Sequence, residues 1–180
     1  MWISPTWEIY ENWCYVRLAE LLKEIEGFVW SVLEGHKSKP TAAIIGENSD
    51  GKIIRLFLQP TFVSFDAKGS REFYSISGRR IPDIVLTIET PTSRQLYIYD
   101  AKYRSSRQGL LDAMSSAHLY RDALRWKGVK THAAILLAPA ANNVGWLLNE
   151  EFQRQERVGI HTLTLGAGQD LIERVRLAIA

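Results

Sequence analysis

The sequence predicts a three-layer α/β domain of the α+β type, in which helices flank a central mixed β-sheet. The 180 residues fit one domain, and 46% of them are apolar, which is enough to build a sizeable core. Strand-like runs follow one amphipathic helical segment and precede two others. This order, α-β-β-β-α-β-β-α, favours a sheet with helices on both faces. No repeat, low-complexity tract or linker interrupts it, so residues 1–180 are expected to form a single domain.

The first element is expected to be one long helix over residues 6–34. Ser4-Pro5-Thr6 is a typical helix start, and Gly35 is a typical stop. Apolar residues recur at alternating steps of three and four, the pattern of one buried helix face. They are Trp7, Tyr10, Cys14, Leu18, Leu21, Ile25, Phe28 and Val32.

The rest of the chain alternates strands and helices. Clusters of Gly, Asn, Asp, Ser and Pro separate the first strands, which are expected at residues 41–46, 53–65, 71–76, 80–89 and 95–103. A helix is expected next, at residues 109–126. Two strands joined by a polar segment follow at residues 132–139 and 159–166, and a last helix is expected from residue 170 onward.

Composition excludes several classes of protein. No apolar run is long enough to span a membrane, and the N-terminus carries acids and tryptophans where a signal peptide has basic and then apolar residues. Cys14 is the only cysteine, which excludes an internal disulfide and any multi-cysteine zinc site. We therefore expect a cytoplasmic protein. The net charge of +2 is too small to indicate a nucleic-acid partner by itself.

Two nucleotide-binding motifs are present only in part. GENSDGKI has the glycine and lysine spacing of a phosphate-binding loop, but Ile53 stands where magnesium binding needs Ser or Thr. A glycine-rich hairpin turn is expected there instead. LGAGQDLIE begins like a dinucleotide-binding turn, but Leu171 occupies the third glycine position. The four histidines lack zinc-ligand spacing.

The tripeptide Asp-Ala-Lys occurs twice, in different surroundings. Asp66-Ala67-Lys68 is followed by Gly69 and Ser70, residues typical of a turn between strands. Asp100-Ala101-Lys102 continues a run of Leu, Tyr and Ile that indicates a buried strand. Asp100 and Lys102 then project on the same face, where a charged pair is costly unless it has partners. The second copy is therefore the candidate for chemistry.

A carboxylate partner for this pair lies on the preceding predicted strand. If that strand and the next form a hairpin turning near Pro91-Thr92, Asp83 comes to lie about opposite Asp100. Directly opposed residues have Cβ atoms roughly 5 Å apart. Two carboxylates so placed either raise one pKa or hold a cation between them.

A third acid lies on the first predicted helix. Glu11 falls at the edge of the apolar stripe, where it either reaches solvent or joins the other acids. Three acids and a lysine at one point would suit a hard divalent cation such as Mg²⁺, which prefers a few carboxylates and keeps several waters. A water bound to the metal near Lys102 would become a nucleophile able to attack a phosphodiester.

These residues resemble a known signature. Pro82-Asp83 followed at strand-length distance by Asp100-Ala101-Lys102 is similar to the motif of the PD-(D/E)XK nuclease superfamily. The segments YENWCYVRL, IPDIVL, YDAKYR and HLYRDAL further resemble the nuclease domains of McrC-like restriction proteins. The resemblance implies a restriction-endonuclease-like fold. One position departs from the pattern: Ser116 stands four residues before Tyr120, where many relatives carry Gln.

The resemblance also implies roles for individual residues. Asp83, Asp100 and the carbonyl of Ala101 would bind Mg²⁺ or Mn²⁺, Glu11 would be the helix-borne acid, and Lys102 would orient or activate the water. Two residues of the second predicted helix have two possible roles each. Tyr120 either supports the site or packs in the core, and His118 either supports the site or makes a surface hydrogen bond. Four arginines flank the proposed site in sequence and are candidates for binding DNA phosphates or simply surface charges; they are Arg79, Arg80, Arg104 and Arg107.

The function expected from the sequence is that of a metal-dependent DNA endonuclease domain, the cutting component of a restriction or antiviral defence system. Its partners would be DNA and a target-recognition protein or an NTP-driven motor, with a homodimer left open and no membrane partner. The alternative is a catalytically silent module of the same fold that binds nucleic acid or a protein. RNA nucleases and junction resolvases are a further alternative.

Overall fold

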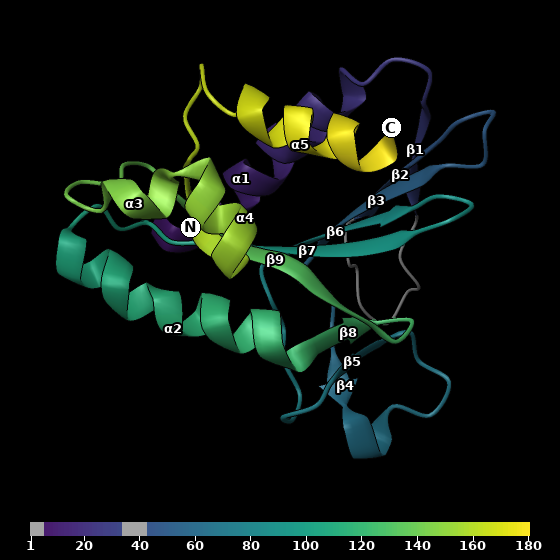
Figure 1. Cartoon of the computed structure of the whole chain (residues 1–180), viewed down its shortest axis with the longest axis horizontal. Helices are drawn as coiled ribbons and strands as arrows, with labels where there is room; N and C mark the ends of the chain where they lie inside the picture. Colours follow the sequence, from purple (N-terminus) through teal and green to yellow (C-terminus); the bar gives the residue numbers. More distant parts are fainter. Residues whose placement is uncertain (1–5, 34–42) are drawn as a thin grey trace, which may run out of the picture.

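The computed structural model describes residues 6–33 and 43–180, which form three layers around a mixed β-sheet (Figure 1). Helices α1 (Thr6–Lys23) and α5 (Gln169–Ile179) cover one face of the sheet, and α2 (Arg107–Ala123) covers the other. Two short helices, α3 (Gly145–Leu148) and α4 (Glu150–Glu156), pack against the strand that follows them. The predicted three-layer α+β class is confirmed. No helix of the described part of the chain is long and apolar enough to cross a membrane.

The strands of the described residues form one sheet in the order β1-β2-β3-β6-β7-β9-β8-β5-β4, with β10 also paired to β9. The strands from β1 to β7 along this path are antiparallel neighbours, whereas β9 runs parallel to both β7 and β10. The strands are β1 (Val29–Leu33), β2 (Ala43–Glu47), β3 (Ile53–Leu58), β4 (Val63–Ser64), β5 (Phe73–Ser75), β6 (Ile84–Glu89), β7 (Arg94–Ala101), β8 (Leu124–Trp126), β9 (Val129–Ala138) and β10 (Val158–Thr162).

Alternation along the central strands creates a separate core on each face of the sheet. In β7, Tyr97 and Tyr99 pack on the side of α1 and α5, and Leu96 and Ile98 pack on the side of α2. Asp100 continues the second series, so its side chain belongs to the face that α2 covers. This alternation decides which helix can reach the carboxylate.

The first helix is shorter than predicted. It ends at Lys23, and the chain turns at Gly27, whose φ of +80° favours glycine, before entering β1. Val29–Leu33 is rich in β-branched and aromatic residues and pairs with β2, so pairing with a strand later in the chain overrides the helical spacing. The predicted helix boundaries at Ser4, Pro5 and Gly35 lie outside the described residues.

The second helix also ends earlier than predicted, at Ala123. Residues 124–126 form β8, which turns back onto β9 through Lys127 and Gly128, both at positive φ. The hydroxyl of Thr131 donates to the carbonyls of Tyr120 and Leu124 at 3.1 and 3.2 Å, which holds this reversal in place. The polar segment after β9 contains α3 and α4, the latter capped by the side chain of Asn149.

Candidate active site

Strands β6 and β7 form the hairpin that brings the two aspartates together. Ile84 lies opposite Tyr99 and Glu89 opposite Arg94, a register that places Asp83 opposite Asp100 at the next position. The turn is closed by the amide of Thr90, which donates to the carbonyl of Ser93 at 2.9 Å. Pro91 and Thr92 form its tip, and the predicted hairpin and register are therefore confirmed.

Asp83 ends the hydrogen-bonded ladder between these strands. Its Oδ2 accepts from the backbone amide of Ala101 at 2.8 Å, in the place where a strand carbonyl would accept. Its own carbonyl accepts from the amide of Gln59 at 2.7 Å. The carboxylate is therefore held at the end of β7 by the amide of Ala101, and the main chain of Asp83 is held by that of Gln59.

Asp100 is almost completely buried, with 2% of its surface exposed. Its Oδ2 lies 2.7 Å from the ammonium nitrogen of Lys102 and accepts from the hydroxyl of Ser116 on α2 at 2.6 Å. Lys102 also lies 4.0 Å from Oδ2 of Asp83. One ammonium group therefore faces two carboxylates, as expected for a buried strand position that needs charge compensation.

The negative charge of the pair is incompletely compensated. Burial, together with the charge of Asp100, raises the pKa of Asp83 to about 8, although Lys102 acts in the opposite direction. A carboxyl in this condition either holds a proton near neutral pH or accepts a further cation. The site therefore fits a hard cation that takes oxygen ligands.

Glu11 projects from α1 toward the same place. It is 4% exposed and accepts from the side-chain amide of Gln59 at 2.5 Å. Burial raises its pKa, the hydrogen bond from Gln59 and the charge of Lys102 lower it, and the charge of Asp100 raises it again. The alternative of a glutamate that merely reaches solvent is wrong for this side chain.

Two residues that sequence reasoning did not assign support this arrangement. Gln59 donates two hydrogen bonds to acidic residues of the site, from its backbone amide to the carbonyl of Asp83 and from its side chain to Glu11. It adopts a φ of +49°, which is unusual for a non-glycine residue. Ser116 reaches Asp100 from α2. The sequence does contain a feature that could have indicated Ser116: it is a polar residue next to the apolar helix face that contains Ala113 and Ala117.

Tyr120 and His118 lie differently with respect to the acids. Tyr120 packs against the core beneath α2, one helical turn after Ser116, and its pKa is raised by burial and then by the charges of Asp100 and Asp83. His118 is exposed and its charge acts on Asp122, on the helix surface. The structure therefore brings Tyr120 to the site and leaves His118 outside it.

The structure places the four candidate arginines in different surroundings. Arg80 is half-buried, bridges to Phe62 through its backbone, and is near enough to Tyr120 to act on its pKa. The guanidinium of Arg107 lies 5.2 Å from the centre of the Trp146 ring. The other two, Arg79 and Arg104, are exposed. Phosphate binding by these side chains stays a prediction.

The first Asp-Ala-Lys copy is a local turn, as predicted. Residues Phe65–Ala67 form a single 3₁₀ turn in which the exposed Asp66 accepts from the hydroxyl of Ser64. The ammonium group of Lys68 lies 5.6 and 5.4 Å from the centres of the Phe65 and Tyr74 rings. Both charged side chains therefore have partners in the turn or in the adjoining strand β5.

Within residues 6–33 and 43–180, no three His, Cys, Asp or Glu side chains are arranged as a complete metal site. A bound cation would rely on Asp83 and Asp100, with Glu11 moving closer and a main-chain oxygen and water completing the shell. Magnesium accepts such a shell, since it keeps several waters and takes few carboxylates.

The fold and the site define an α+β domain with two opposed aspartates and a lysine at the end of a central hairpin. A family model of the PD-(D/E)XK nuclease superfamily matches residues 8–143, a range that includes every residue of the site. The chain belongs to this superfamily. No curated protein and no solved structure matches the chain significantly.

Proposed function

We propose that the protein is a divalent-metal-dependent DNA endonuclease and acts as the cutting component of a McrC-like restriction or defence system. The observation that supports it best is the hairpin register that opposes Asp83 and Asp100, with Lys102 2.7 Å from Asp100. Membership of a nuclease superfamily supports phosphodiester hydrolysis as the reaction class. The intact set of Asp83, Asp100 and Lys102 argues against a silent module, which could replace these charges without loss.

Each residue of the site has a task in hydrolysis by a single attack of water. Asp83 and Asp100, with the carbonyl of Ala101 and with Glu11, would hold Mg²⁺ or Mn²⁺. The bound cation would neutralise charge on the phosphate and acidify a water. The ammonium of Lys102 can hold the attacking water and offset the charge that develops as the bond to the leaving sugar oxygen breaks. Ser116 and Gln59 keep two of the carboxylates in position.

The direct test is to incubate the purified protein with plasmid, single-stranded DNA and RNA in magnesium, manganese or chelator. We expect plasmid cleavage with either metal and none with chelator. Binding without cleavage in any metal would favour the silent module, and cleavage of RNA alone would contradict the DNA assignment.

The isolated protein is expected to cut with little sequence preference. Phosphate contacts position DNA but carry no sequence information, and the described residues show no element set aside for reading base edges. We propose that a partner, such as an NTP-driven motor or a target-recognition protein, chooses the site in DNA, and that a homodimer would allow both strands to be cut. Sequencing of fragment ends checks this: scattered ends are expected, and a sharp motif would contradict it. Binding should weaken steeply with salt.

Glu11→Gln is expected to lower the cleavage rate by roughly 10²-fold or more, a typical effect for a group that acts on the reacting centre. The amide is isosteric and leaves the neighbouring Gln59 in place, so the melting temperature should change little. Glu8→Gln, one turn earlier on the same helix, is the matched control and should cut like the wild type. An unchanged rate in Glu11→Gln would show that this acid is only structural.

A further inference from the structure

Two cavities on opposite faces of β9, the first beside α2 and the second beside α5, lie far from the catalytic aspartates. Their volumes are about 330 and 380 Å³, and Arg157 lines both. Pairing along β9 shows how far the first cavity is from the site. Leu137 pairs with Ala101 at the catalytic end of β7, whereas Thr131 pairs with Leu96. Thr131 lines the first cavity. These positions are five residues apart on β7, or about 17 Å along the strand. We call the two cavities together the basic groove.

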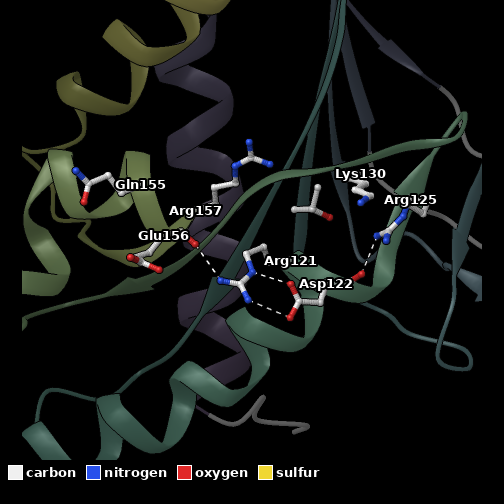
Figure 2. A pocket seen from close by; sticks show the side chains of 8 residues that line it. Arg121, Asp122, Arg125, Lys130, Gln155, Glu156 and Arg157 are labelled. Carbon is white, nitrogen blue, oxygen red and sulfur yellow. Dashed lines mark hydrogen bonds and ion pairs between the residues drawn. The ribbon is translucent and has the colours of Figure 1, made fainter.

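The basic groove concentrates the positive charge of the chain. Six cationic side chains and three acidic ones line it, an excess of three, although the whole protein carries only +2. In the first cavity, Arg125 and Lys130 project from directly paired positions on β8 and β9 (Figure 2). The cations are Arg121, Arg125, Lys130, Arg154, Arg157 and Arg174, and the acids are Asp122, Glu150 and Glu156.

Most of these cations have no carboxylate partner. Arg121 is paired with Asp122 at 2.7 Å, but the other five make no ion pair among the described residues. Arg176, on the same helix as Arg174, shows the contrast, because it is paired with Glu173 at 2.5 Å. One guanidinium nitrogen of Arg174 is also buried without a hydrogen-bond partner. Unpaired like charges around a concave surface attract an anion.

The second cavity adds aromatic rings to this charge. Tyr97 and His132 line it, with their ring centres 5.0 Å apart, and the largely exposed Leu177 adds an apolar side chain. A groove of cations with aromatic rings is the arrangement that binds single-stranded nucleic acid, since phosphates meet the cations while unpaired bases stack on the rings. Duplex DNA offers its phosphates but keeps its bases stacked internally. The rings therefore favour a single strand.

We propose that the basic groove is a second nucleic-acid-binding site, which holds a single strand away from the catalytic carboxylates. Arg154, Arg157 and Arg174 lie beyond residue 143, outside the range that the superfamily model matches. The site therefore extends past the shared nuclease core and is separate from the proposed cleavage. It does not require the catalytic residues to be active.

Binding can be measured without cleavage by using Asp83→Asn protein in chelator and a fluorescent oligothymidylate, compared with a duplex of equal length. In this background, Arg157→Gln with Arg174→Gln should weaken single-strand binding about tenfold or more, and should reduce the slope of log K against log salt by about 1.4. The control pair is Arg71→Gln with Arg176→Gln, which removes the same charge outside the groove and should change binding little.

A third variant tests the rings. Tyr97→Leu should weaken single-strand binding about five- to 150-fold, the effect of losing one stacked base, and should leave duplex binding unchanged. If Tyr97→Leu lowers the melting temperature, the exposed His132→Ala replaces it. Equal losses in both arginine pairs would overturn the site, and ring variants without effect would overturn its assignment to a single strand. None of these readouts depends on whether the wild-type protein cleaves DNA.

Discussion

Cleavage of plasmid DNA is expected to be lost in Asp100→Asn and in Lys102→Ala, by roughly 10²- to 10⁴-fold. Asp100 carries the hydrogen bond from Ser116 and the ion pair with Lys102, so it holds the centre of the site together. An amide at this position can still accept from Ser116 but has no net charge to offer a cation or the ammonium group. The measurement is the initial rate of plasmid nicking in magnesium.

The first Asp-Ala-Lys copy supplies the matched control. Asp66→Ala with Lys68→Ala removes the same two residue types from an exposed turn, and its cleavage rate should stay within a few-fold of the wild type. Lys102→Ala leaves a buried carboxylate without its cation, which is destabilising, so the melting temperature of each variant should be measured as well. Loss of cleavage in a folded Asp66/Lys68 double variant would contradict the assignment of chemistry to the second copy alone.

The hairpin could be predicted because its information is local. Apolar residues between Asp83 and Asp100 define two strands, and Pro91-Thr92 falls at the only break between them. Once the turn is placed, antiparallel pairing fixes which residues lie opposite each other. The Asp83–Asp100 pair therefore followed from eighteen consecutive residues, without knowledge of the rest of the sheet.

The errors lie where distant segments decide the outcome. Residues 29–33 have apolar spacing that suits a helix, but β2 offers them backbone partners and they pair as β1. Gln59 is another case, since it meets Glu11 across 48 residues of sequence. Neither contact leaves a periodic pattern in the chain. Ser116 was predictable in part. Its departure from the superfamily pattern marked the position, but the sequence did not reveal its hydrogen bond to Asp100.

The response to pH and metal should depend on Asp83. The pKa of this carboxyl is about 8 in the folded protein and about 3.9 in an unfolded chain. Between these values the folded state binds more protons than the unfolded state, so the free energy of unfolding should fall as pH rises from about 4 to about 8 in metal-free protein. In Asp83→Asn this contribution disappears, and the difference between the two stability curves isolates it from other titrating groups.

A divalent cation should reverse the loss of stability at the alkaline end. At pH 8.5 the ionised Asp83–Asp100 pair can bind magnesium, whereas at pH 5 a proton occupies the same place. At a hundredfold excess over its Kd, magnesium should stabilise the fold by about 2.7 kcal/mol, which is about 5 to 10 °C in melting temperature for a chain of this size. The rise should be much smaller at pH 5 and in Asp83→Asn at either pH.

If magnesium raised the melting temperature of both proteins equally at pH 8.5, the cation would bind elsewhere. If it raised neither, the aspartate pair would not be its site, and the proposed metal dependence would lose its structural basis.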